Sequence, residues 1–149
     1  MAYKFVGKSV PRLEGADKVS GKTRYAADVD IPDALWAKLL RSPLPHARIL
    51  KVDTSKAAKL PGVRAVITGL DIPPVLTGLR MKDMPVLARD RVRYVGEPVV
   101  AVVAETRELA RDASELLEIE FEPLPTLVDP LRAQDDGAPG SIAFSGSVI

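Results

Sequence analysis

The chain has 149 residues, of which 46% are hydrophobic and 28% are charged, and its net charge is +1. This is the composition of one ordinary globular domain, and so small a charge predicts no binding to nucleic acid or to an anionic membrane. Because the sequence has no cysteine, this chain offers no disulfide, thiolate zinc site or iron–sulfur ligand. It has no apolar run of about 20 residues and no signal-peptide core in residues 1–10, so we expect a cytoplasmic protein.

Amide and basic residues are used unevenly. The sequence has 13 prolines, 12 arginines against 9 lysines, one glutamine (Gln134) and no asparagine. Two explanations stay open: thermophilic proteins avoid thermolabile amides, and a GC-rich genome favours arginine and proline codons.

The first part of the chain predicts, in order, an arm, two strands, a short helix and a third strand: residues 1–20, 35–40, 49–52, 56–60 and 64–68. The arm shows no helical stripe. In the first strand Leu35, Ala37 and Leu39 share one face, which we expect to point toward the core. Residues 53–55 offer an N-cap to the helix, and Pro61-Gly62 closes it.

Two segments lack any apolar period. Residues 71–87 are rich in proline and glycine and indicate a long surface loop. Residues 132–149 are small, polar and rich in glycine and serine, and we predict a mobile tail there.

The clearest local pattern is a strand–helix–strand unit over residues 92–123. Its apolar run, residues 99–103, predicts a strand covered on both faces. Thr106 is the expected N-cap of a helix that runs to about Leu117. The helix has one apolar stripe, made of Leu109, Ala110, Ala113, Leu116 and Leu117. We therefore expect Leu116→Asp to destabilise the domain by more than about 3 kcal/mol and Glu115→Ala to change little.

A second, half-buried strand follows this helix. Ile119 and Phe121 alternate with glutamates, and Pro123 ends the strand.

Charge is distributed unevenly along the chain. Residues 1–24 carry six basic and two acidic side chains, whereas residues 105–136 carry three basic and ten acidic ones. Two solvated faces of opposite sign are the favoured interpretation. The alternative is docking against an oppositely charged domain or subunit.

Candidate catalytic residues are few, and for each a structural role is favoured. His46 is the only histidine, so any catalytic triad would need it, but it lies at the entry to a strand. Glu97 and Glu105 could form a carboxylate pair. Because they flank a strand that rises about 3.3 Å per residue, we expect them to be too far apart. Glu97 beside Pro98 is expected to be a turn residue.

Two segments are candidate phosphate sites, and for each a structural explanation is favoured. Residues 21–23, Gly-Lys-Thr, resemble the end of a P-loop but lack its earlier glycine and its preceding strand. Arg89, Arg91 and Arg93 alternate, so they are expected on one strand face, where they could grip a phosphate or an acidic partner. A solvated or salt-bridged edge strand is favoured.

Eight short motifs follow one another along most of the chain: residues 7–12, 18–28, 41–43, 46–49, 61–69, 94–103, 124–125 and 129–130. In their order and spacing they resemble the molybdenum-cofactor subunit of the xanthine dehydrogenase, aldehyde oxidase and carbon monoxide dehydrogenase family. The resemblance implies that residues 1–131 are the first domain of that subunit, an α/β hammerhead. This is an α+β fold with a mixed sheet and two main helices, and residues 132–149 would follow it as a flexible tail.

The resemblance also implies a non-catalytic structural domain of a molybdenum hydroxylase. In the family, the cofactor-binding and catalytic residues lie in later domains. We therefore assign no catalytic, cofactor-binding or metal-binding residue to this chain. Molybdenum–molybdopterin is implied for the full-length enzyme alone.

The partners that the resemblance implies are the remaining domains of the molybdenum subunit and the FAD and iron–sulfur subunits. A homo-oligomer would also cover a bare apolar patch, for which Trp36, Val75 and Leu76 are candidates. Two alternatives stay open. One is a free-standing binding module that uses the 71–87 loop or the arginine face, and the other is one half of a split subunit whose catalytic half is a separate polypeptide.

Overall fold

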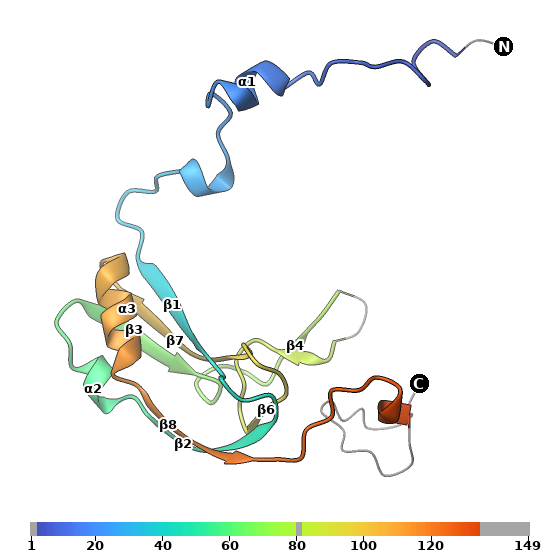
Figure 1. The fold of residues 1–149 in the computed structure, drawn as a ribbon. Helices are drawn as coiled ribbons and strands as arrows, with labels where there is room; N and C mark the ends of the chain where they lie inside the picture. The colour runs from blue at the N-terminus through green and yellow to red at the C-terminus, as the bar shows by residue number, and fades with distance from the viewer. Residues whose placement is uncertain (1–2, 80–81, 135–149) are drawn as a thin grey trace. The chain divides into compact units, whose positions relative to one another are not determined.

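The computed structural model describes residues 3–79 and 82–134, and the chain divides into two units. Figure 1 shows the elements of each unit. The first unit comprises residues 1–34 and the second comprises residues 35–149. All the described strands belong to the second unit.

The first unit has little regular structure. Its elements are helix α1 (Gly15–Val19) and a 3₁₀ turn (Ala26–Asp28). The Asp28 carboxylate fixes this turn by accepting a hydrogen bond from the Tyr25 N–H at 2.8 Å. None of the described side chains before residue 35 is buried. The expected arm therefore contains one helix that the sequence pattern missed, because five residues are too few to show an apolar stripe.

The first sheet of the second unit has the strand order β1-β7-β3, and both of its pairings are antiparallel. Its strands are β1 (Trp36–Arg41), β7 (Pro98–Ala104) and β3 (Val63–Thr68). The predicted apolar strand is thus the central one. On one of its faces Val100, Val102 and Ala104 are buried. On the other face Val99 is buried and Ala101 and Val103 are half-buried. The sequence predicted that β7 is covered on both faces, but only one of its faces is completely buried.

The second sheet has the strand order β6-β2-β8 and is also antiparallel. Its strands are β6 (Arg91–Val92), β2 (Ala47–Asp53) and β8 (Glu118–Pro123). The short helix α2 (Ser55–Ala58) follows β2. Helix α3 (Arg107–Glu115) connects β7 of the first sheet to β8 of the second. The described helices and sheets confirm the α+β class.

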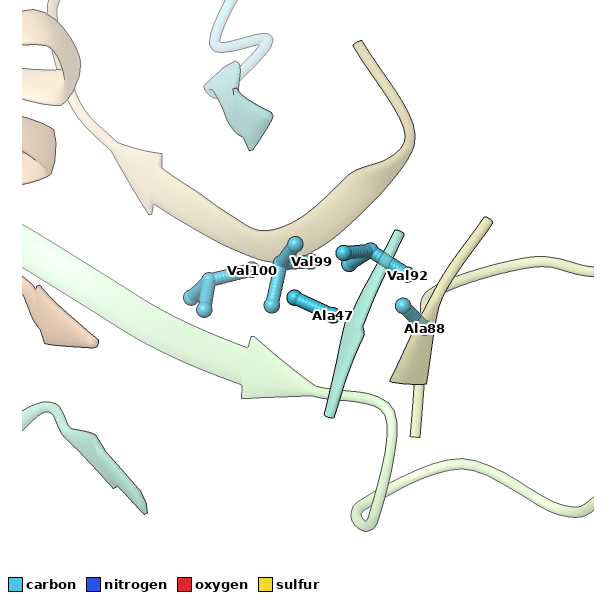
Figure 2. Close-up of a cluster of buried hydrophobic side chains, with 5 residues drawn as sticks. All are labelled: Ala47, Ala88, Val92, Val99 and Val100. Carbon is cyan, nitrogen blue, oxygen red and sulfur yellow. The ribbon is translucent and has the colours of Figure 1, made fainter. Parts of the chain in front are cut away.

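Two clusters of buried side chains hold the second unit together. The larger cluster, shown in Figure 2, consists of Ala47, Ala88, Val92, Val99 and Val100. Because its members come from β2, β6, β7 and the segment before β6, this cluster joins the two sheets. The smaller cluster, made of Ala57, Val102 and Ala113, fastens α2 and α3 to β7.

Helix α3 begins where the sequence predicts and ends earlier. The Thr106 hydroxyl accepts a hydrogen bond from the Leu109 N–H at 3.2 Å, which satisfies one of the free donors of the first turn. The helix ends at Glu115, and Leu116 is the C-cap residue and 38% exposed. Leu117 packs against both core clusters instead. The expected place of Leu116 on the buried stripe, from which the large effect of Leu116→Asp was predicted, is therefore wrong, because α3 ends at residue 115.

The prediction of which face of β1 points toward the core is also wrong. Leu40 lies opposite Val100 and packs against the larger cluster, whereas Leu35 and Ala37 are exposed. Trp36 belongs to the same alternating set as Leu40 but is 51% exposed at the strand's end. Both alternating sets contain leucine, so alternation could not decide between them.

Residues 71–87 contain more regular structure than the expected loop. Strands β4 (Leu76–Thr77) and β5 (Met84–Pro85) form a short antiparallel hairpin, and strands of two residues are too short to show alternation. Of the predicted tail, Arg132–Gln134 forms a 3₁₀ turn, and the remainder lies outside the described residues.

Candidate functional site

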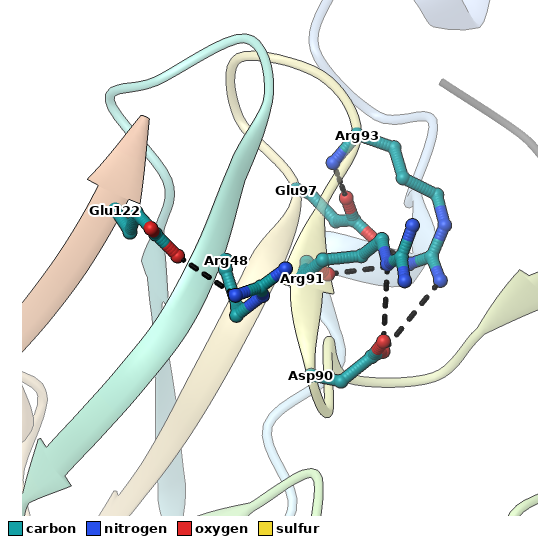
Figure 3. A network of polar contacts seen from close by, with 6 residues as sticks. All are labelled: Arg48, Asp90, Arg91, Arg93, Glu97 and Glu122. Carbon is teal, nitrogen blue, oxygen red and sulfur yellow. Dashed lines mark hydrogen bonds and ion pairs between the residues drawn. The ribbon is translucent and has the colours of Figure 1, made fainter. Parts of the chain in front are cut away.

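Among the described residues, the most deeply buried charged side chain is that of Glu97, in the turn between β6 and β7. Its exposed fraction is 2%. Oε2 accepts a short hydrogen bond from the Arg93 N–H, and Oε1 lies 3.3 Å from Arg93 Nη1 (Figure 3). The Ser42 N–H donates to the Glu97 carbonyl at 2.9 Å, and the Gly96 N–H donates to the Ser42 carbonyl at 2.8 Å. This arrangement secures a turn and keeps the carboxylate away from any substrate in solvent.

Glu97 does lie in a turn, as its place before Pro98 indicates, but the sequence reasoning missed its burial and its ion pair. The available signal was the spacing of four residues between Arg93 and Glu97 around Gly96, whose φ is +93°. Glycine adopts this left-handed conformation without steric cost, so the chain reverses tightly and brings the two charges together.

The three alternating arginines do not share one binding face. Arg89 donates to the carbonyl oxygens of Gly69 and Ile72, at 2.9 and 2.8 Å. Arg91 Nε donates to Asp90 at 3.0 Å, and Arg93 Nη2 lies 3.8 Å from the same carboxylate. Arg91 and Arg93 thus form ion pairs in and beside the edge strand β6, as expected for a salt-bridged edge, whereas Arg89 lies before this strand and hydrogen-bonds to the backbone.

Asp90 is the acidic centre of this network (Figure 3). Partial burial of the carboxyl raises its pKa, but the hydrogen bond from Arg91 and the charges of Arg91 and Arg93 outweigh burial. The pKa of Asp90 therefore lies below its ordinary 3.8. Asp90 is accordingly an anion at neutral pH, and we assign it no acid–base role.

His46 is 7% exposed at the entry to β2. Its Nδ1 lies 2.7 Å from the Pro125 carbonyl oxygen, and the Leu124 N–H donates to the His46 carbonyl at 2.9 Å. Because a carbonyl only accepts, Nδ1 carries the proton. Nε2 is buried without a hydrogen-bond partner among the described residues. This geometry supports a structural histidine that fastens the segment after β8 to β2.

Glu105 lies beyond the opposite end of β7 from Glu97 and pairs with Arg64. The intervening strand, Pro98–Ala104, extends over about 20 Å at 3.3 Å per residue, which is too far for a carboxylate pair. The Glu105 N–H donates to the Gly62 carbonyl at 3.1 Å. Glu105 therefore contributes to the contact between the α2–β3 turn and the start of α3.

The acidic residues of β8 form ion pairs within the second unit. These pairs are Arg48–Glu122 at 3.0 Å, Lys51–Glu120 at 4.0 Å and Lys56–Glu118. The hydrogen bond and charge of Glu118 raise the pKa of Lys56. All six side chains are about half exposed or more, so each pair adds little stability. The acidic part of the chain is thus partly neutralised by β2 and α2.

Residues 21–23 form the turn after α1. The N–H groups of Lys22 and Thr23 both donate to the Asp17 carbonyl, at 2.9 and 3.2 Å. A phosphate-binding loop needs such donors free, and here they are used within the turn.

Two hollows in the described part of the second unit are lined by residues that come from several elements. The larger, about 150 Å³, is lined by residues 49–52, 68–70, 88–89 and 99, and the smaller, about 50 Å³, is lined by residues 72–76, 85–87 and 89. Ligand pockets commonly measure roughly 300–1,000 Å³. Among residues 3–79 and 82–134, no three His, Cys, Asp or Glu side chains gather as metal ligands would. We therefore assign none of the described residues to a molybdenum–molybdopterin cofactor.

Several apolar side chains of the second unit face solvent. Trp36, Val75 and Leu76 are 51%, 59% and 47% exposed, so the candidates for an association patch are accessible. None of the described helices has the length and hydropathy that a membrane crossing requires.

Together, these features define a small α+β domain whose buried charges stabilise its own turns. A family model for the α/β hammerhead domain of aldehyde oxidase and xanthine dehydrogenase matches residues 20–125. The chain belongs to this family.

Similar proteins carry this domain within much longer chains. The chain is 42% identical to the nicotine 6-hydroxylase large subunit of Paenarthrobacter nicotinovorans, covering 89% of itself and 17% of that protein. It is 43% identical to the carbon monoxide dehydrogenase large chain of Afipia carboxidovorans, and this match covers 86% of the chain and 16% of that protein. The solved structure of quinoline 2-oxidoreductase from Pseudomonas putida matches with a TM-score of 0.76 at 37% identity. This match covers 89% of the chain and 18% of the solved chain. The chain thus spans about one sixth of these relatives.

Proposed function

We propose that this chain is the structural hammerhead domain of a molybdenum hydroxylase large subunit and contributes scaffold rather than redox chemistry. The observation that carries the proposal is the use of the buried Glu97–Arg93 pair within the β6–β7 turn. The match to one domain, about one sixth of each relative cited above, supports the same conclusion.

In this proposal the rest of the subunit holds the cofactor. Two relatives are named for molybdenum or its pterin: a Cu,Mo-containing carbon monoxide dehydrogenase, and the nicotinate dehydrogenase large molybdopterin subunit of Eubacterium barkeri. FAD and iron–sulfur subunits would complete the enzyme, as the resemblance of the sequence motifs implies.

One comparison favours a divided subunit as the second candidate. The chain covers 32% of the Eubacterium barkeri subunit, twice its 16% share of the Afipia carboxidovorans large chain. That relative is therefore about half as long, so a shorter large subunit occurs in this family. In such an arrangement, this domain would work beside a catalytic polypeptide that is encoded separately.

A domain exchange tests the proposal. The region of the Afipia carboxidovorans large chain that corresponds to residues 20–125 is replaced by those residues, with the corresponding region of the Bacillus subtilis relative as control. If the domain is scaffold, the chimera keeps the host's molybdenum content and its oxidation of carbon monoxide. A chimera with full metal content and an altered substrate preference would contradict the proposal.

A further inference from the structure

The larger hollow of the second unit is lined by residues of both sheets. They come from β2, from the end of β3, from β7 and from the segment before β6. Most of the lining side chains are aliphatic, two are basic and none is acidic. The volume is about 150 Å³, and a single water molecule needs only about 10–15 Å³ of such space. The hollow therefore has room for a small organic molecule.

Two features of the backbone shape this hollow. The pairing of β2 with β8 shifts in register between Ile49 and Lys51, so Leu50 lies in a β-bulge, a feature that often occurs beside binding and active sites. At the end of β3, a Cβ atom added to Gly69 would lie 2.3 Å from the Ala88 carbonyl oxygen. A glycine at this position thus permits the close approach of two segments that line the hollow.

Arg89 supplies a positive charge to the lining. Its Nη1 donates to the carbonyl oxygens of Gly69 and Ile72. Because a guanidinium has five N–H groups, three donors remain on Nε and Nη2, and none of the described residues accepts from them. The side chain is half-buried, and no described carboxylate forms an ion pair with it, in contrast to Arg91 and Arg93. A half-buried cation without a counter-ion favours the binding of an anion.

The acidic residues closest to this guanidinium in the sequence have other partners. The Asp71 carboxylate accepts from both the N–H and the hydroxyl of Thr68, at 2.7 Å, and Asp90 belongs to the ion-pair network described above. The second basic residue of the lining, Lys51, lies 4.0 Å from Glu120. The guanidinium is therefore the cation of the hollow to which the described part of the chain supplies no counter-ion.

We propose that the larger hollow binds a small aliphatic monocarboxylate, whose carboxylate pairs with Nε and Nη2 of Arg89 and whose hydrocarbon part contacts Leu50 and Leu70. The two parallel N–H groups of a guanidinium match the two oxygens of a carboxylate. Phosphate and sulfate are poorer ligands, because the aliphatic lining offers no replacement for the rest of their hydration shell. The site is built from this chain alone, so the inference does not depend on the proposed function.

The test titrates butyrate into the full chain labelled with ¹⁵N, at constant ionic strength, and follows the amide signals by NMR. We expect saturable shifts at the amides of Leu50, Gly69, Leu70 and Arg89, with a Kd of about 1–10 mM for so small a ligand. Butyramide has the same size but no charge. It should bind at least about tenfold more weakly, because it cannot form the ion pair with the guanidinium.

Leu70→Glu tests the site without touching the arginine. Leu70 is 73% exposed, so the variant should fold, and its carboxylate would compete with butyrate for Arg89 and repel it. We expect at least about tenfold weaker binding of butyrate. Val128→Glu, at a residue that is 87% exposed and lines neither hollow, makes the same change in net charge and should bind as the parent chain does. Arg89→Lys keeps the charge but not the paired N–H groups, and should also bind butyrate more weakly.

Three results would overturn the inference. Equal binding of butyramide and butyrate would show that the charge of the ligand is not recognised. Equal binding of butyrate by Leu70→Glu and the parent chain would show that the ligand lies elsewhere. Shifts that do not saturate, or that spare the amides of the hollow, would show that the hollow holds no carboxylate. None of these results would alter the proposal that the domain is scaffold.

Discussion

The buried ion pair of the β6–β7 turn offers the sharpest test of the structure. Glu97→Ala removes the carboxylate that accepts from both the Arg93 N–H and the Arg93 guanidinium. The side chain of Arg93 is only 22% exposed, so water replaces the lost partner incompletely. The turn between the two sheets would therefore hold an unpaired N–H and a poorly solvated cation.

The expected loss of stability in Glu97→Ala is large for a single substitution. Hydrogen bonds to charged groups contribute about 1.5–3 kcal/mol each, and removing one partner of a buried pair costs about 3–5 kcal/mol. Arg93 keeps a contact with Asp90 at 3.8 Å, which places the expected loss near the lower end, at about 3 kcal/mol. At roughly 2–4 °C per kcal/mol, the thermal midpoint falls by about 6–12 °C.

Urea unfolding followed by circular dichroism measures this loss. Glu97→Gln keeps an acceptor for the N–H and should lose about half as much. Glu122→Ala is the matched control, because this carboxylate is 49% exposed beside Arg48, and its loss should stay under about 1 kcal/mol. If Glu97→Ala and Glu122→Ala destabilise equally, the argument from burial is refuted.

Three further predictions concern the packing and the turns of the second unit. Leu117→Asp should lower the free energy of unfolding by about 2–4 kcal/mol and Leu116→Asp by less than about 1 kcal/mol, because Leu117 packs against both clusters; equal thermal shifts would contradict this. Gly69→Ala should lower the free energy of unfolding, measured in urea, by about 1–3 kcal/mol, because the added methyl group would lie 2.3 Å from a backbone carbonyl oxygen. An unchanged midpoint of urea unfolding would oppose this. Hydrogen bonds from Thr68 hold the pKa of Asp71 below its ordinary 3.8, so its stabilising effect is complete at neutral pH and is lost as the pH falls below that value. Unfolding measured over a pH series should show Asp71→Asn less stable than the parent at neutral pH, with a difference that shrinks in acid; a difference independent of pH would count against the ionised carboxylate.

The sequence predicted those elements whose local signals are strong. The apolar run at residues 99–103 belongs to the central strand β7, and Thr106 caps α3 as expected. Both signals depend on neighbouring residues only. The alternation around Ile119 and Phe121 likewise identifies β8.

The errors arose where tertiary contacts decide between equivalent local patterns. Leu116 and Leu117 both continue the apolar stripe, and only the end of α3 at Glu115 places Leu117 inside. In β1, Leu39 and Leu40 occupy opposite faces, and the pairing with β7 decides which one reaches the core cluster.

At the candidate site, too, local features were predicted and contacts between distant segments were missed. A turn at Glu97 follows from its neighbours, and its partner Arg93 lies in the same turn, but its other partner, Ser42, comes from a distant segment of the chain. The carbonyl partners of Arg89 lie 17 and 20 residues away in the chain. No local pattern indicates such contacts, whereas the series of family motifs identified the domain.

The central claim is that this domain is scaffold, and metal content together with turnover tests it most directly. The full chain is purified from a host that makes the molybdenum cofactor. Molybdenum per chain is then measured beside dye reduction with purines, aldehydes and carbon monoxide. Our account predicts molybdenum far below one atom per chain and no dye reduction above the rate without protein. One molybdenum atom per chain together with turnover on any of these substrates would contradict it.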